Sequence, residues 1–292
     1  MEKINRISVR NYIEESEFGE ESSFVTLPFY FDGKPIESAG WGMTLLSAGS
    51  MRFRWNEINE RRAKFLEELE SDFFYSDSCK KAFVPLELIH SKIVYDINAA
   101  SDTKNKTGDG MITKNRFLIP VVTVADCMPL FLYDRETGVF GAFHSGWKGT
   151  GIIGEGIKLA GEKYGSKPEN ICVAIGPHIG DCCYKIDESR AEYFTENFGE
   201  LCVKKSAAPD KRNPELKYDL SLTEANLFVL KKSGIPNENI VVAEDCTCCT
   251  TFKNNKNVFG SFRRQAAFLP AEISADERSR SMTVQAAFAF RR

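Results

Sequence analysis

Cys127 and His144 are the residues whose types and placement first indicate chemistry. The chain has only three histidines, at positions 90, 144 and 178, so few imidazoles are available to any mechanism. Cys127 follows a predicted buried strand and His144 lies at the end of a later one, and side chains at strand ends can meet in one cleft. The pair permits a Cys–His nucleophile, or part of a zinc site with one position open to water or substrate. A buried thiol and a hydrogen-bonded core histidine are the structural alternative.

A glycine-rich loop, Ser145-Gly146-Trp-Lys148-Gly-Thr-Gly, follows His144 and joins a predicted strand to a predicted helix. Exposed N–H groups at a helix start attract anions, and the Lys148 ammonium adds positive charge. The loop is therefore predicted to bind phosphate, although its spacing is not that of a P-loop. A tight turn with a packed tryptophan is the alternative interpretation.

Four charged residues elsewhere fit the same chemistry. Arg263 and Arg264 lie near a predicted sheet end and could hold phosphate bidentately, or could simply form surface ion pairs. Asp109 and Asp126 are carboxylates that could carry protons or orient a metal-binding histidine. A turn aspartate and a buried orienting aspartate are their structural alternatives.

A second loop, IGPHIGDCCY, contains His178, Cys182 and Cys183, and a CTCC segment spans 246–249. His178 could be a ligand, but the glycine and proline around it favour a shaped loop with one polar side chain. The cysteines at 182, 183, 246, 248 and 249 could form a structural zinc site. Their spacing does not match a pair of CxxC knuckles, so buried free thiols are the favoured interpretation.

Strands and helices are predicted to interleave along the chain, which favours one α/β domain over residues 1–292. An amphipathic helix is predicted over 56–74, and a Gly-rich irregular segment over 32–54. A serine-capped helix is predicted to begin at Ser221 and to end near Gly234. A polar loop and a solvated insertion are predicted over 101–110 and 204–217. The predicted strands cover 24–31, 117–125, 130–133, 139–143, 171–175, 240–243 and 282–290.

Composition restricts the class of protein. The chain has 292 residues, 42% of them hydrophobic, with 38 Lys and Arg against 41 Asp and Glu. A formal net charge of −3 gives no global attraction to nucleic acid or anionic lipid. The longest apolar stretch is far shorter than the about 20 residues of a membrane span, and no secretory signal is recognisable at the N-terminus. We therefore expect a cytoplasmic protein without nucleic-acid or membrane partners, whose nine cysteines are thiols.

Several motifs together resemble one known family. VADCMPL, AFHSGWKG, IGPHIGDCCYKI, DLSLTEAN and EDCTCCTTFKNNKNVFGSFRR occur in the order of the YfiH-like family, over about residues 80–265. That family is labelled laccase-domain or multicopper polyphenol oxidase, and is also described as purine nucleoside phosphorylase. The resemblance implies an α+β fold, with mixed β-sheets sandwiched by helices (αββα) in a single domain.

The resemblance also implies a zinc site and an activity. The metal ligands carried over are His90 in ELIHSK, Cys127 and His144. The implied reaction is phosphorolysis of adenosine, inosine or methylthioadenosine, with deamination of adenosine as a second activity. The sequence departs from the family pattern at Leu88-Ile89, Ser145, Lys148 and Phe262, and the family's N-terminal Arg-Gly-Gly pattern is largely missing.

The number of histidines distinguishes between the oxidase and phosphorylase activities that the family's labels suggest. A multicopper oxidase needs a His-rich trinuclear cluster besides a Cys/His copper site, and three histidines cannot build both, although copper could bind adventitiously. We therefore expect a zinc-dependent purine nucleoside phosphorylase whose partners are a purine nucleoside and phosphate. A metal-independent Cys–His hydrolase and a non-catalytic purine- or partner-binding module are the alternatives.

Overall fold

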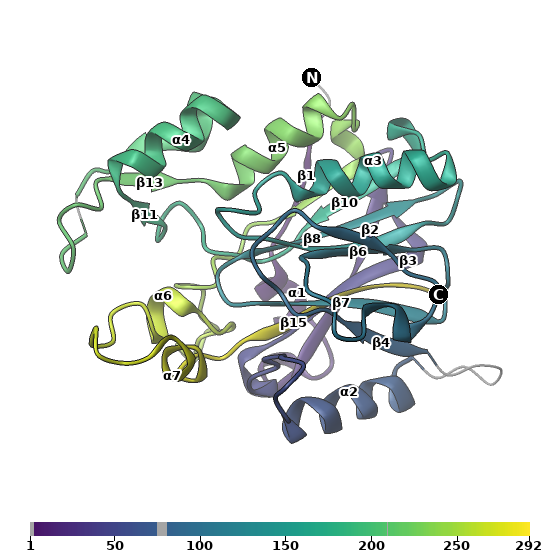
Figure 1. Ribbon diagram of the computed structural model, residues 1–292, viewed down its shortest axis with the longest axis horizontal. Coiled ribbons are helices and arrows are strands. Elements are labelled where there is room, and N and C mark those ends of the chain that lie inside the picture. The colour runs from purple at the N-terminus through teal and green to yellow at the C-terminus, as the bar shows by residue number, and fades with distance from the viewer. Residues whose placement is uncertain (1–2, 75–80, 209) are drawn as a thin grey trace.

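Two stacked β-sheets form the centre of the computed structural model, which describes residues 3–74, 81–208 and 210–292 (Figure 1). The strands of the larger sheet are β1 (Asn5–Ile7), β5 (Val94–Asp96), β6 (Gly110–Thr113), β8 (Met128–Asp134), β9 (Phe140–Ser145), β10 (Ile171–Ile175) and β14 (Ile240–Ala243). The strands of the second sheet are β2 (Phe24–Phe31), β3 (Lys34–Thr44), β4 (Ala82–Pro85), β7 (Leu118–Val124) and β15 (Gln285–Arg291). Their spatial orders are β1-β14-β10-β8-β9-β6-β5 and β2-β3-β15-β7-β4.

Both sheets are mixed. In the larger sheet β8 is antiparallel to β9 and β10, whereas β10 and β14 are parallel. In the second sheet β15 is antiparallel to β3 and β7, whereas β4 and β7 are parallel. A small third sheet has the order β11-β13-β12, from β11 (Lys185–Ile186), β12 (Val203–Lys205) and β13 (Tyr218–Leu220).

Helices cover the outer faces of both large sheets (Figure 1). The α-helices are α1 (Val9–Glu14), α2 (Glu60–Asp72), α3 (Ile152–Tyr164), α4 (Glu188–Phe198), α5 (Leu222–Lys232), α6 (Phe262–Gln265) and α7 (Ala275–Arg280). In Figure 1, α3 and α5 lie over the larger sheet and α2 lies beyond the second sheet. At one end, α4 with the small sheet and α6 with α7 project as two lobes.

Side-chain alternation along the strands explains this layering. In β8, Phe131 and Tyr133 belong to the core between the two sheets, and Leu130 and Leu132 to the core under α3 and α5. Because successive strand side chains point to opposite faces, one wholly apolar strand can supply both cores. The indole of Trp41 stacks on Phe131 across the sheets, with ring centroids 5.2 Å apart. The predicted αββα arrangement of mixed sheets and helices is confirmed, and the described residues form one folded unit.

Most predicted elements are present with small shifts at their ends. The irregular segment predicted over 32–54 is wrong, because β3 occupies 34–44 of it. Gly40 and Gly42 lie in this strand where a Cβ would meet the rings of Phe290 and Phe288 at 2.6 and 2.7 Å. The glycines therefore mark close packing against aromatic rings of β15, not a loop.

Two helices begin at capping side chains. The Asn59 side chain accepts a hydrogen bond from the Arg62 N–H at 3.0 Å and starts α2, so Ile58 lies outside the helix and is exposed. Ser221 caps α5 by accepting from the N–H of Glu224.

Within the described residues, no helix has the length and apolar character that crossing a bilayer requires. Cys79 and part of the 204–217 segment lie outside the described residues.

Candidate metal centre and pocket

His90, Cys127 and His144 lie together at one end of the two sheets. One potential ligand atom of each lies within 4.8 Å of the others. Cys127 sits in the connection between β7 and β8, His144 lies in β9, and His90 follows β4. The imidazoles of His90 and His144 meet edge to face, with centroids 4.8 Å apart. Three separate chain segments thus bring one thiol and two imidazoles to the spacing of a metal site.

Gly146 keeps the space between these three side chains open. A Cβ at this position would lie 3.0 Å from Sγ of Cys127 and 3.1 Å from Cδ2 of His90. Any larger residue would therefore fill the volume toward which the ligand atoms converge. The backbone at Gly146 therefore runs close to the ligand triad, and its role in substrate binding stays a prediction.

Asp109 holds two of the three ligands in place from a fully buried position. Its Oδ1 lies 2.9 Å from Nδ1 of His144 and accepts the His90 N–H at 2.9 Å. Its Oδ2 accepts the N–H and the hydroxyl of Ser91, each at 2.6 Å. A carboxylate can only accept, so Nδ1 of His144 carries the proton and Nε2 is left for Cys127 or a metal.

The backbone of His90 also depends on Asp109. His90 has a φ of +60°, in the left-handed region that costs a non-glycine residue about 1–3 kcal/mol. Asp109 accepts the N–H groups of His90 and Ser91, and these bonds fix the turn. The turn aims an exposed imidazole at the centre.

The charges of Cys127 and His144 stabilise one another. Burial by itself would raise the pKa of Cys127, but the His144 charge and hydrogen bonds from His144 and His90 lower this pKa to about 6. Burial would lower the pKa of His144, but Cys127 and Asp109 raise it to about 9. The thiolate, the form that binds metal, is therefore favoured at this position.

A pocket of about 420 Å³ is lined by His90 and Cys127 of the triad and lies between the lobe of α4 and the lobe of α6 and α7. Its volume is in the range of small-molecule sites. Aromatic side chains that line it are Trp147, Tyr184 and Phe262, and the cationic side chains are Arg54, Arg190 and Arg263. The pocket thus combines apolar walls, positive charge and the Cys/His centre.

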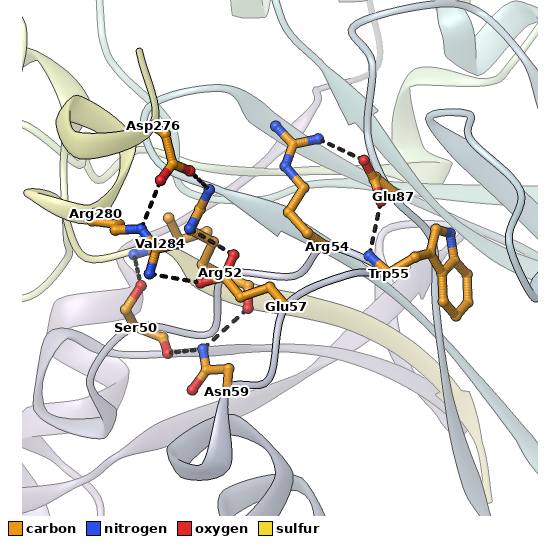
Figure 2. Close-up of polar contacts among 10 residues, drawn as sticks. All are labelled: Ser50, Arg52, Arg54, Trp55, Glu57, Asn59, Glu87, Asp276, Arg280 and Val284. Carbon is orange, nitrogen blue, oxygen red and sulfur yellow. Dashed lines mark hydrogen bonds and ion pairs between the residues drawn. The ribbon is translucent and has the colours of Figure 1, made fainter. Parts of the chain in front are cut away.

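The position of Arg54 is fixed by the segment that leads to His90. Figure 2 shows the Arg54 guanidinium beside Glu87, with Nη1 3.2 Å from Oε1. The second oxygen of Glu87 accepts the N–H of Trp55 at 2.9 Å, and Arg54 also donates to the carbonyl of Leu88. Sequence reasoning missed Arg54, because an isolated arginine in a loop gives no local signal of where its side chain points.

A neighbouring charge network attaches α7 to the loop that carries Arg54 (Figure 2). Arg52 lies 2.6 Å from Glu57 and 2.5 Å from Asp276. Arg280 lies 2.8 Å from Asp276 and 3.6 Å from Glu57. Since Ser279 lines the pocket, these four alternating charges fix one wall of it.

The loop after His144 enters the pocket only in part. Gly146 and Trp147 line the pocket, whereas Lys148 is exposed, lies outside the lining and places its ammonium 5.4 Å from the Trp147 ring centroid. Ser145 is fully buried in β9, and its hydroxyl has no hydrogen-bond partner among the described residues. Arg190, from α4, was missed by sequence reasoning and does line the pocket, with its guanidinium 4.6 Å from the Trp147 ring centroid.

The two consecutive arginines have different surroundings. Arg263 lines the pocket, donates to the Lys185 carbonyl at 3.0 Å and lies beside the Tyr184 ring. Arg264 turns away and donates to the backbone carbonyls of Thr247, Cys248 and Phe259. Arg263 therefore lies on the pocket wall, where its Nη1 is also 3.9 Å from Oδ2 of Asp210, whereas the guanidinium of Arg264 is directed at backbone carbonyls outside the pocket lining.

Asp126 joins three segments next to Cys127. One carboxylate oxygen accepts the Thr247 hydroxyl at 2.7 Å and the other accepts the Arg263 N–H at 2.5 Å. Its backbone carbonyl accepts the N–H of Ile179 at 2.9 Å. Burial raises the pKa of Asp126, and these hydrogen bonds oppose the rise. Both side-chain oxygens are thus used to anchor the pocket walls.

His178 lies outside the triad and has partners for both ring nitrogens. Nδ1 lies 2.9 Å from the Gly176 carbonyl and Nε2 lies 3.0 Å from the Thr223 hydroxyl. The shaped-loop interpretation of His178 agrees with this geometry.

The expectation of buried thiols in the second cysteine group is wrong for Cys182 and Cys249, which are exposed because they lie on surface loops.

Comparison with known proteins identifies the family. A family model described as multi-copper polyphenol oxidoreductase laccase matches residues 56–268. The chain belongs to this family. Among solved structures, the hypothetical protein YfiH of Bacillus licheniformis has the same fold, with a TM-score of 0.70 at 24% identity over 87% of this chain and 93% of that one.

Curated relatives carry names that state activities, as two examples show. Purine nucleoside phosphorylase YlmD of Geobacillus stearothermophilus is 33% identical over 165 residues, which cover 55% of this chain and 59% of that protein. The crystal structure of YlmD from the same organism has a TM-score of 0.66 over 91% of this chain and 96% of that one, at 25% identity. Adenosine deaminase RL5, from an unknown prokaryotic organism, is 30% identical over 146 residues, or 48% of this chain and 53% of that protein. The sequence matches thus span less than two thirds of both curated relatives.

Proposed function

We propose that this protein is a zinc-dependent purine nucleoside phosphorylase that also deaminates adenosine. The observation that carries the proposal is the convergence of one thiol and two imidazoles at the base of a pocket with aromatic walls and three arginines. The names of the two curated relatives support the same substrate class.

The donor set fits a catalytic zinc ion. Cys127, His144 and His90 supply one sulfur and two nitrogens, which leaves one position of a tetrahedron open. Asp109 orients His144, as a carboxylate does behind many metal-bound histidines. When bound there, zinc would supply a Lewis acid with net positive charge for an anion or a water molecule.

The remaining side chains divide between the purine and the phosphate. The side chains of Trp147, Tyr184 and Phe262 line the pocket and offer apolar contact to a planar base. In phosphorolysis phosphate attacks C1′ of the ribose as the base leaves, so the phosphate must be held close to the sugar. Guanidinium groups hold phosphate oxygens well, and Arg54, Arg190 and Arg263 are available on the pocket wall.

Asp109 acts in this proposal through the ligands and not on the substrate. Its two oxygens are occupied by His90, Ser91 and His144, and it is fully buried. We therefore assign it as a positioning residue, which revises the catalytic role expected for it. Asp126 holds the chain at Arg263 and Thr247 in the same indirect way.

The multicopper label of the family does not fit the histidines of this chain. A trinuclear copper cluster needs many imidazoles, and of three histidines His178 is paired elsewhere. Copper bound adventitiously in place of zinc would occupy only the Cys/His centre, which is not a trinuclear cluster.

A direct test is turnover of inosine and adenosine with and without phosphate, on protein of measured zinc content. Base release that requires phosphate supports phosphorolysis, and ammonia release from adenosine without phosphate supports deamination. Cys127→Ala should abolish both reactions while circular dichroism shows an unchanged fold. Full turnover by this variant would refute the proposal, and tight purine binding without turnover would indicate a binding module.

A Cys–His hydrolase is the second candidate, because Cys127, His144 and Asp109 lie in the order of a nucleophile, base and orienting carboxylate. The two candidates differ in what protects the thiol. Zinc that shields Cys127 from alkylation supports the metal enzyme. Stoichiometric acylation of Cys127 by an activated ester in zinc-free protein supports the hydrolase.

A further inference from the structure

A second group of thiols lies outside the pocket, on two loops that follow neighbouring parallel strands. Cys182 and Cys183 lie after β10, and Cys246 and Cys249 lie after β14. One ligand atom of each of the four lies within 4.8 Å of the others. Along the chain, Cys246 and Cys249 have the CxxC spacing of a metal knuckle, and the other half-site is an adjacent pair.

Two of the sulfur–sulfur separations are close to those of a tetrahedral thiolate site, and all lie within 4.8 Å. Sγ of Cys182 lies 3.7 Å from Sγ of Cys249 and 3.9 Å from Sγ of Cys183. Four sulfurs at about 2.3 Å from a central zinc ion lie about 3.8 Å from one another. Disulfide-bonded sulfurs would be only about 2.05 Å apart.

A backbone N–H group beside the sulfurs donates to one of them, which would stabilise a thiolate. The N–H of Gly180 donates to Sγ of Cys246 at 3.2 Å. A Cβ on Gly180 would lie 3.2 Å from Sγ of Cys182, so glycine allows the chain to run this close to the sulfurs. A backbone hydrogen bond joins the two loops without a metal, because the Thr247 N–H donates to the His178 carbonyl at 3.0 Å.

We propose that Cys182, Cys183, Cys246 and Cys249 bind a second zinc ion, separate from the Cys/His centre. Each thiol that is protonated releases its proton to solvent as the metal binds, and zinc undergoes no redox change. All four positions are taken by protein sulfurs, so this site is structural.

The second site connects the loops that form one wall of the pocket. Ile179 and Tyr184, which flank the first cysteine pair, line the pocket. Thr247, within the second half-site, donates to Asp126 beside Cys127. A metal that joins these loops therefore fixes the pocket wall without touching the substrate.

Metal stoichiometry tests the proposal directly. We expect about two zinc ions per wild-type chain, and about one in Cys127→Ser and in the double variant Cys182→Ser/Cys249→Ser. Both serines of the double variant lie at exposed positions, where folding tolerates the change best. Cys202→Ser, which replaces a buried thiol outside both groups, is the matched control and should keep the wild-type stoichiometry.

X-ray absorption at the zinc edge of Cys127→Ser gives a second readout that does not depend on activity or on altering the cluster. Four sulfur neighbours at about 2.3 Å support the proposal. It is overturned if Cys127→Ser binds no zinc while its cluster thiols react freely or are disulfide-bonded. It is also overturned if the folded double variant keeps the wild-type zinc content. The wild type and the double variant share the same Cys/His centre, so any difference in their zinc content reports on the cysteine cluster alone. Failure of the phosphorylase proposal would leave that difference unaffected.

Discussion

Oδ1 of Asp109 lies 2.9 Å from Nδ1 of His144 and also accepts the backbone N–H of His90, so one buried carboxylate positions two candidate metal ligands. The three residues come from different segments, and the carboxylate has no direct path to the pocket. The geometry of the centre therefore depends on a residue that the substrate never meets.

Replacing Asp109 by asparagine should weaken metal binding. The amide nitrogen must replace either Oδ1, which faces Nδ1–H of His144 and the N–H of His90, or Oδ2, which faces the N–H and hydroxyl of Ser91, so at least one buried donor loses its acceptor. We expect zinc affinity to fall about 10–100-fold and the free energy of unfolding to fall by about 1–3 kcal/mol. Chelator competition and urea denaturation measure the two effects. An unchanged zinc affinity would contradict the orienting role of Asp109.

A methyl group at position 146 should remove the metal without unfolding the protein. In Gly146→Ala the new Cβ meets Sγ of Cys127 at 3.0 Å and Cδ2 of His90 at 3.1 Å, inside the ligand triad. We expect zinc at the Cys/His centre and purine turnover to be lost together. Gly161→Ala in α3 is the matched control, since its Cβ would meet only the carbonyl oxygen of Ser166 at 3.5 Å, and it should keep both properties.

Arg190 and Lys148 both approach the ring of Trp147, but only Arg190 lines the pocket. If Arg190 binds phosphate, Arg190→Ala should lower kcat/KM for phosphorolysis about 10–100-fold, the effect of one hydrogen bond to a charged group. Lys148→Ala should change it by less than about twofold, because a solvent-screened charge outside the pocket contributes little. Steady-state kinetics at varied phosphate distinguish the two variants. Equal losses of kcat/KM in the two variants would indicate that phosphate binds at the loop that carries Lys148.

Replacing Arg263 should mainly affect turnover, whereas replacing Arg264 should mainly affect the stability of the fold. Arg264→Ala leaves the carbonyls of Thr247, Cys248 and Phe259 without their donor, and we expect the free energy of unfolding to fall by about 3 kcal/mol. Arg263→Ala should cost about 1 kcal/mol and act mainly on turnover. Denaturation curves and kinetics for the two variants test this. A larger stability loss in Arg263→Ala would reverse the assignment.

Local sequence pattern was sufficient for much of the fold. Period-two and wholly apolar runs located β2, β10 and β14 without error at their ends, because such runs follow from which faces are buried. The pattern failed at β3, where glycines that accommodate the rings of Phe288 and Phe290 look like loop residues. Short strands such as β1 and β5 were missed because three residues carry no recognisable period.

By itself, the sequence determined the residue types at the centre: a cysteine and a histidine at strand ends, and His90 through the order of the family's motifs. Only the tertiary structure decided that Arg190 and Arg54 line the pocket while Lys148 and Arg264 do not, and that the sulfurs of four cysteines from two loops lie within 4.8 Å of one another. Residue type fixes what a side chain can do. Its direction depends on backbone angles and on partners far along the chain, as with Asp109 and His144, and those are set only when the sheets pack.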